Sequence, residues 1–242
     1  MDAKSARGTE AERWAEGDST DQAASQLANS ALLAMGGGFL DGFTYVGHGH
    51  VFANAMTGNV VLLGINCFSG AVGSGLRHLP PILMFVLGVA VAKTLETPAM
   101  ARLLRHPHLA SLLIQIASLS ALALLPEGTR DMWFTTSIAF VASIQVESFR
   151  RVNGRSFNST YTTGNLRTFA ESCFAWLFAG GGGEARSATW DFGVICFAFF
   201  AGAAAGGIVT MPLGNRALWI DVVLLGIVAV RVRPRAVAVA VS

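Results

Sequence analysis

The chain alternates apolar segments with short polar connections, and each segment has the length of a membrane-crossing helix, about 20 residues. Such segments lie at about 27–47, 79–96, 108–126, 131–149, 190–211 and 216–232. The stretch FGVICFAFFAGAAAGGIVTMPLGN at 192–215 has no charged residue. The pattern therefore predicts an all-α fold, a polytopic bundle of membrane helices.

Two further segments, at about 51–69 and 156–179, are apolar but contain several polar residues. The first includes NAMTGNVVLLG at 54–64 and the second TYTTGNLRTFA at 160–170, so each carries Thr-Gly-Asn. Polar groups are costly in hydrocarbon unless they are paired or line a cavity. The pattern leaves two arrangements open, one with six crossings and one with eight.

The two Thr-Gly-Asn motifs indicate an internal repeat. A shift of 106 positions takes residues 57–59 to residues 163–165. The same shift pairs Phe43 with Phe149, Val46 with Val152, Cys67-Phe68 with Cys173-Phe174, and Asp41 with Glu147. We expect a first membrane repeat at 27–126 and a second at 131–232.

The distribution of basic residues favours six crossings, because cytoplasmic connections carry an excess of Lys and Arg. With the N-terminus inside and neither motif segment crossing, only Arg77, Arg130 and Arg216 face outward. Eight crossings would divide the basic residues almost evenly and leave Arg167 inside the membrane. Six crossings imply two inverted halves, each with three crossings and one re-entrant or broken helix, and cytoplasmic N- and C-termini.

The motifs supply the residue types of a buried polar site. Glycine permits a backbone break, Thr and Asn offer hydroxyl and amide groups, and a half-helix beginning there presents unpaired N–H groups to an anion. The candidate substrate-binding residues are Asp41, Asn54, Thr57, Gly58, Asn59, Thr163, Gly164 and Asn165. The alternative is that Thr and Asn only hydrogen-bond between packed helices.

Acidic residues inside apolar segments are functional candidates, because a carboxylate in hydrocarbon is costly. Asp41 lies toward the outer end of the first crossing, where it could also reach the headgroups. Glu147 precedes Arg150 by three residues, which favours a salt bridge at the cytoplasmic edge; Gln145 and Glu147 are secondary candidates. Asp221, inside the last crossing, stays ambiguous between a functional role and a packing role.

Small-residue spacing points to close helix packing. Gly38 and Gly42 are four residues apart, as are Gly202 and Gly206. We expect these pairs to let helices approach closely.

Composition narrows the class of function. Charged residues make up 13% of the chain, about half the share typical of soluble domains, and the basic ones lie in connections, so we expect no nucleic-acid partner. The three cysteines lack metal-ligand spacing, and no nucleophile–base pair or cofactor motif occurs. We expect no enzyme, metal or cofactor.

Residues 1–26 are expected to form a disordered acidic cytoplasmic tail, and 233–242 a short C-terminal tail.

GGFLDGFTYVGHGHVFANAMTGNVVLLG at 37–64 and IQVESFRRVNGRSFNSTYTTGNLRTFAE at 144–171 resemble the YoaK-like family of bacterial membrane proteins, a domain of unknown function. The resemblance covers about 27–232. It implies a multi-pass protein of the bacterial cytoplasmic (inner) membrane and supplies no substrate. The residues that carry it are Phe52, Asn54, Thr57, Gly58, Asn59, Gln145, Phe149, Arg150, Arg151, Thr163, Gly164 and Asn165.

The sequence favours a small secondary transporter or exchanger with a central site at the paired motifs. Its expected partners are the lipid bilayer and an unidentified small polar or anionic solute, and the chain's size is compatible with a homodimer. The alternative is a non-transporting membrane scaffold or sensor whose motifs are helix-packing devices.

Overall fold

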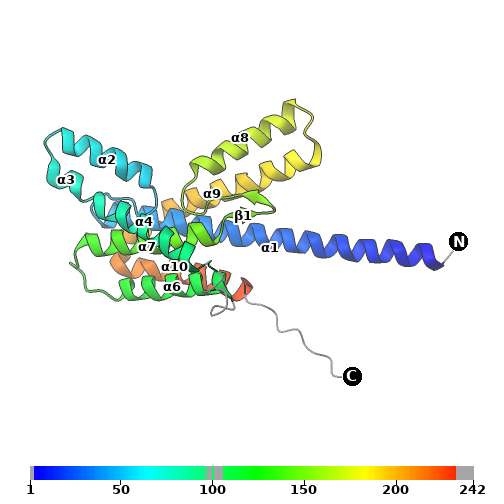
Figure 1. The fold of residues 1–242 in the computed structure, drawn as a ribbon, viewed down its shortest axis with the longest axis horizontal. Coiled ribbons are helices and arrows are strands. Elements are labelled where there is room, and N and C mark those ends of the chain that lie inside the picture. Colours follow the sequence, from blue (N-terminus) through cyan, green and yellow to red (C-terminus); the bar gives the residue numbers. More distant parts are fainter. Residues whose placement is uncertain (1–2, 96, 98–99, 101–105, 233–242) are drawn as a thin grey trace, which may run out of the picture.

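The computed structural model describes residues 3–95, 97, 100 and 106–232, with side chains from residue 24 onward. This part of the chain is almost entirely helical, as the sequence predicts (Figure 1). The helices are α1 (Ala3–Gly47), α2 (Met56–Phe68), α3 (Val72–Leu76), α4 (Leu79–Leu95), α6 (Pro107–Ala123), α7 (Asp131–Ser148), α8 (Thr163–Phe178), α9 (Gly182–Leu213) and α10 (Leu218–Val232). A 3-10 turn, η1 (Gly214–Ala217), joins α9 to α10, and two short antiparallel strands, β1 (Arg151–Val152) and β2 (Arg155–Ser156), lie between α7 and α8.

Each of the six predicted apolar segments falls on a long helix, and these helices form the body of the molecule. Helix α1 packs on α9 and α10, α7 packs on α4 and α6, and α6 packs on α10. Their contacts enclose an apolar core whose largest fully buried side chains include Leu33, Phe39, Phe43, Leu112, Leu119, Phe134, Ile138, Leu218 and Leu225.

Helix α1 begins at Ala3, so its backbone includes residues 3–26, which the sequence analysis expects as a disordered tail. Ala, Glu, Arg, Lys and Gln are strong helix formers, and they supply many of these residues. The other expected tail, 233–242, lies outside the described residues.

Glycines bring α1 and α9 into backbone contact. A Cβ added at Gly38 or Gly42 would overlap the carbonyl oxygen of Phe199 or Ala203 on α9. A Cβ at Gly202 or Gly206 would overlap a carbonyl oxygen of α1 in the same way. The close packing predicted from the glycine spacing is therefore confirmed. It is reciprocal, because glycines of each helix contact backbone carbonyl groups of the other.

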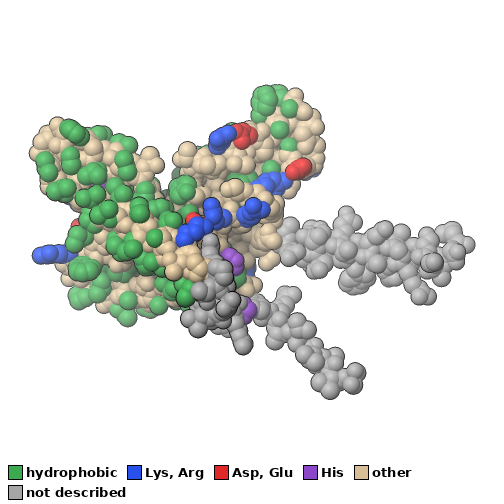
Figure 2. All heavy atoms as spheres, in the orientation of Figure 1, with side chains coloured by type: hydrophobic (Ala, Val, Ile, Leu, Met, Phe, Trp, Pro, Cys, Tyr) green, Lys and Arg blue, Asp and Glu red, His purple; other side chains and the backbone are tan. Residues whose placement is uncertain are grey.

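Two arms diverge from the body as a V (Figure 1). The first arm is α2 with α3, and the second is α8 with the N-terminal part of α9 that packs on it. The N-terminal ends of α2 and α8 lie at the vertex of the V, and a notch separates the arms in the space-filling view (Figure 2). Both Thr-Gly-Asn motifs therefore begin helices at the same level of the molecule.

Two helical stretches of the described chain, Val72–Leu95 and Gly182–Val232, are long and apolar enough to cross a membrane. The second has 51 residues and contains η1, where the chain reverses direction between α9 and α10 (Figure 1). Apolar side chains also cover the arms, and Phe68 at the end of α2 is 96% exposed. Exposed apolar surface of this extent is typical of membrane or protein contact.

Candidate functional site: a polar junction at Gly37

Two non-helical segments, residues 51–55 and 157–162, lead into α2 and α8 and meet at Gly37 of α1. The Nδ2 of Asn54 donates a hydrogen bond of 2.7 Å to the carbonyl oxygen of Gly37. From the other segment, the carbonyl oxygen of Ser159 occupies the space that a Cβ at Gly37 would need. We call the residues 51–59 and 157–165, together with Gly37, the junction.

Each motif asparagine holds the segment that precedes its own helix. The amide of Asn59 accepts from the N–H of Phe52 at 3.2 Å and donates to the carbonyl of the same residue at 2.6 Å. Asn165 makes the same pair of hydrogen bonds with Asn158, at 3.1 and 2.6 Å. Phe52 and Asn158 are related by the same shift of 106 positions as the two asparagines, so the two motifs have the same local geometry.

A buried histidine that the sequence analysis missed supports the first motif. The Nδ1 of His78, in the turn just before α4, lies 3.2 Å from Oδ1 of Asn59, and His78 is 3% exposed. His78 is 19 positions from Asn59. No spacing rule relates two residues at that separation, and only the return of α3 and α4 along α2 brings them together.

Asp41 lies beside the junction and holds its first segment. Its Oδ1 accepts the backbone N–H of Asn54 at 2.8 Å. One turn further along α1, Oγ1 of Thr44 accepts the N–H of Ala53 at 3.2 Å. Asp41 therefore lies next to Asn54, with one carboxyl oxygen bound to the backbone.

The threonines and glycines of the motifs lie in the first turns of the two helices. Thr57, Thr163 and Gly164 are exposed at the vertex of the V, and their N–H groups have no acceptor among the described residues. A Cβ at Gly58 would press on the ring of Phe52, whereas Gly164 has free space. These first turns can offer N–H groups to a ligand that enters the notch.

Three polar atoms at the junction are buried without a hydrogen-bond partner in the described chain: Oδ1 of Asn54, Oγ of Ser159 and Oγ1 of Thr162. Asn54 and Ser159 are fully buried, whereas Thr162 is half-buried. Unpaired buried polar atoms are rare, because each one loses its hydrogen bonds to water. The sequence analysis included Asn54 and missed Ser159, whose counterpart in the first half, Ala53, is apolar.

The secondary candidates lie apart from the junction. Gln145 donates to the carbonyl of Leu33 on α1 at 3.4 Å. Glu147 pairs with Lys93 on α4 and with Arg150 at 2.9 Å. The expected salt bridge of Glu147 with Arg150 is therefore present.

Ionic contacts tie down the loops at both ends of the molecule. The Nδ1 of His48, the first residue after α1, lies 3.1 Å from Oδ1 of Asp131 at the start of α7. Burial lowers the pKa of His48 from its ordinary value, and the nearby carboxylate of Asp131 opposes this effect.

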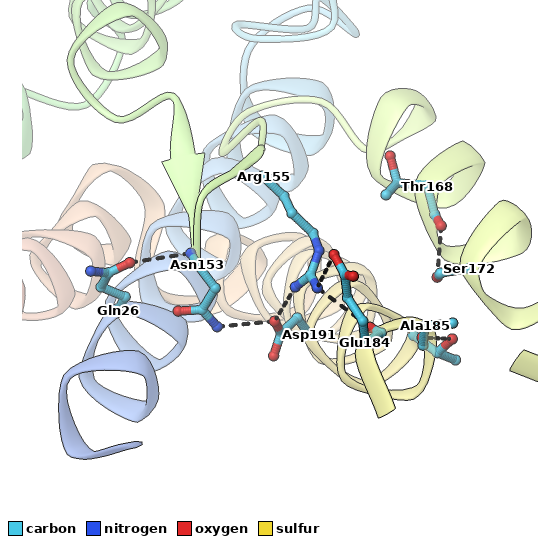
Figure 3. Close-up of polar contacts among 9 residues, drawn as sticks. Gln26, Asn153, Arg155, Thr168, Ser172, Glu184, Ala185 and Asp191 are labelled. Atoms are coloured by element: carbon cyan, nitrogen blue, oxygen red, sulfur yellow. Dashed lines mark hydrogen bonds and ion pairs between the residues drawn. The ribbon is translucent and has the colours of Figure 1, made fainter. Parts of the chain in front are cut away.

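At the other end, the β1–β2 turn is bound to α9 and α1 (Figure 3). Asn153 and Arg155 both reach Oδ2 of Asp191, at 2.9 and 3.4 Å, and the N–H of Asn153 donates to Gln26 on α1. This turn connects α7 to the segment that leads into the second motif. Its contacts therefore fix the approach to the junction.

A groove of about 680 Å³ lies in the second arm, away from the junction. Its lining is mainly apolar and includes Phe169, Trp176, Trp190 and Phe197. The convergent polar groups lie at the junction, so we place the candidate site there.

The helices, the apolar surfaces and the two stretches of membrane-spanning length define an all-α protein with membrane-helix character. The family model described as "Protein of unknown function (DUF1275)" matches residues 30–231, so the chain belongs to that family. This confirms the expected membership in a domain family of unknown function, and the match does not carry the YoaK-like label. No curated protein and no solved structure matches the chain.

Proposed function

We propose that the protein is a multi-pass membrane transporter or exchanger of a small polar or anionic solute, with its binding site at the junction. The observation that carries this proposal is the pair of unpaired buried atoms, Oδ1 of Asn54 and Oγ of Ser159, where two helix N-termini converge. A solute with a hydrogen-bond donor would give Oδ1 of Asn54 a partner, and an oxygen of the solute could accept a hydrogen bond from the hydroxyl of Ser159.

The first turns of α2 and α8 favour an anion. Helix N-termini carry a partial positive charge from aligned peptide dipoles, and their free N–H groups bind carboxylate or phosphate oxygens. The free N–H groups of Thr57, Thr163 and Gly164 lie in these first turns, on residues that are exposed. No basic side chain belongs to the junction, so the backbone would supply the positive end of the site.

The order of helix contacts supports an arrangement of two halves. Helix α1 precedes the first motif and packs on α9 and α10, while α7 precedes the second motif and packs on α4 and α6. If α1 to α6 and α7 to α10 are inverted copies in a bacterial inner membrane, the two motif helices enter from opposite sides. Transporters with inverted repeats bind their solutes at such a meeting point.

Ser159 provides the sharpest test of the site. Its hydroxyl has no partner, so Ser159→Ala removes a buried unsatisfied group and should leave stability unchanged or raise it by about 1 kcal/mol. We would measure the melting temperature of the purified protein in detergent against a panel of small carboxylates, phosphates and sulfate. Any solute that raises the melting temperature would then be tested for uptake into proteoliposomes that contain the protein.

We expect at least one solute to raise the melting temperature of the wild type, with the shift lost in Ser159→Ala. Ser172→Ala is the matched control, because Oγ of Ser172 bonds only to carbonyls of its own helix, α8. Equal solute shifts in Ser159→Ala and Ser172→Ala would exclude the junction as the site.

The scaffold alternative has its own supporting observation. The side-chain amides of Asn59 and Asn165 are both engaged with backbone groups, as packing devices would be. It predicts that no solute of the panel changes the melting temperature and that proteoliposomes take up none of them.

A further inference from the structure

A buried acid lies against α1 one residue before the junction. Asp221 of α10 is 1% exposed, and its Oδ1 fills the space that a Cβ at Gly36 would need. Gly36 directly precedes Gly37, where the two motif segments meet. The carboxyl group and the junction therefore share consecutive residues of one helix.

The carboxyl group of Asp221 has no hydrogen bond or ion pair with any residue that the structure describes, and its Oδ1 is fully enclosed. The charged or titratable side chains described on the elements that pack against α10 are Asp41 and Tyr45 on α1, His108 on α6 and Arg216 in η1. Asp41 accepts from Asn54, Tyr45 stacks on Phe52, His108 lies beside the ring of Phe149, and Arg216 is exposed. None of them pairs with Asp221, nor does Arg231 on its own helix.

An enclosed carboxyl group without a partner is stable in its neutral form, because the charged form needs water or a counter-charge. The packing of α10 on Gly36 therefore favours the protonated acid. Ionisation requires a conformation in which α1 and α10 separate enough to admit water. Proton binding and the packing of α1 are linked by this geometry.

The other half of the chain carries a neutral group at the related position. The shift of 106 positions takes Gln115 of α6 to Asp221 of α10. Gln115 is also buried, and its Nε2 donates to the carbonyl of Ser111 in its own helix at 3.2 Å. Of these two related positions, only Asp221 can bind and release a proton.

We propose that Asp221 is a proton-binding site that couples solute movement at the junction to a proton gradient. The proposal rests on the proposed function, and it identifies the coupling ion as H⁺. One O–H bond forms when the carboxylate takes a proton from water on one side, and the same bond breaks when the proton leaves to the other.

Infrared difference spectroscopy of the full chain in lipid tests proton binding without any solute. We expect a protonated-carboxyl C=O band whose intensity falls as the pH rises in the wild type and which is missing in Asp221→Asn. Glu171→Gln is the control, because Glu171 is exposed on α8, where it pairs with Arg167 of the same helix, and its replacement should leave the band as in the wild type. Loss of the titrating band in Asp41→Asn, with retention in Asp221→Asn, would overturn the proposal.

Uptake driven by a pH gradient tests coupling. With a solute found by the melting screen, Asp221→Asn proteoliposomes should lose at least tenfold of gradient-driven accumulation, while Glu171→Gln shows the gradient dependence of the wild type. If solute uptake by the wild type does not depend on the pH gradient, the coupling of transport to protons is overturned. The proposed transport function would then still hold. A titrating Asp221 band in a protein that transports none of the panel would contradict the proposed function and support the proton site.

Discussion

At the scale of single residues, the two motif asparagines have the same task. Asn59 and Asn165 each use both ends of the amide to hold the N–H and C=O of one residue seven positions earlier. These backbone groups belong to non-helical segments, which have no helix or sheet partner for them. These polar residues occur in apolar segments because their side chains provide hydrogen-bond partners for backbone groups. In the proposed function, a solute would bind the neighbouring side-chain atoms of Asn54 and Ser159.

Removing one of these amides should destabilise the fold. Asn165→Ala leaves the N–H and C=O of Asn158 unpaired, and we expect a loss of about 2–4 kcal/mol, since each unsatisfied buried group costs ~1–3 kcal/mol. Unfolding of the purified protein in detergent would measure it.

Asn66→Ala is the matched control for that variant. The side chain of Asn66 donates to the carbonyl of Leu62 within α2, so its loss should change stability by no more than about 0.5 kcal/mol. Equal stability of the two variants would contradict the role of Asn165 in holding the backbone of Asn158.

At the scale of elements, glycine sets how closely α1 and α9 pack. Backbone carbonyls of each helix lie against glycines of the other, at Gly38 and Gly42 on α1 and at Gly202 and Gly206 on α9. A backbone carbonyl cannot rotate away as a side chain can, so this interface tolerates little added volume. It places Gly36 and Gly37 in the interior of the body.

Gly206→Ala should disrupt this interface. The new Cβ would overlap the carbonyl of Phe39, and we expect a loss of about 3 kcal/mol, the upper end for overpacking. Gly226→Ala on α10 is the comparison, because no heavy atom lies within 4 Å of its Cβ position. There the helix should gain about 0.5–1 kcal/mol. A melting temperature for Gly206→Ala at or above that of Gly226→Ala would refute the packing role.

Element positions followed well from the sequence, whereas the start of each motif helix did not. The apolar segments predicted α1, α4, α6, α7, α9 and α10 because hydrophobic length alone indicates a helix. The segments at 51–69 and 156–179 divide into a non-helical part and a helix that begins at Met56 or Thr163. Their boundary depends on the contacts with Gly37, which no local pattern contains.

At the scale of the whole molecule, the two arms diverge from a shared vertex (Figure 1). The ends of α2 and α8 point away from each other, and their apolar surfaces are exposed. In the proposed membrane arrangement, the end of α2 lies toward the outer side and the end of α8 toward the cytoplasm.

Cysteine labelling of the two arm ends tests this orientation. In a background with Cys67, Cys173 and Cys196 replaced, we would introduce Ser69→Cys or Ala179→Cys, both at exposed positions just after α2 and α8. An impermeant maleimide should label the first from outside and the second only from the cytoplasmic side. Labelling of both from the same side would rule out inverted halves.

The sequence by itself determined the all-α class, the six long helices, the glycine-mediated packing and the membership in a domain family of unknown function, because each depends on hydrophobic length, residue spacing or recognisable motifs. It also indicated Asp41, Asn54 and the two motifs as one group. The tertiary structure decided that the two motif segments meet at Gly37, that His78 supports Asn59, and that Ser159 and Asp221 are buried without partners. Those facts arise from the packing of helices distant in sequence, which local patterns do not specify.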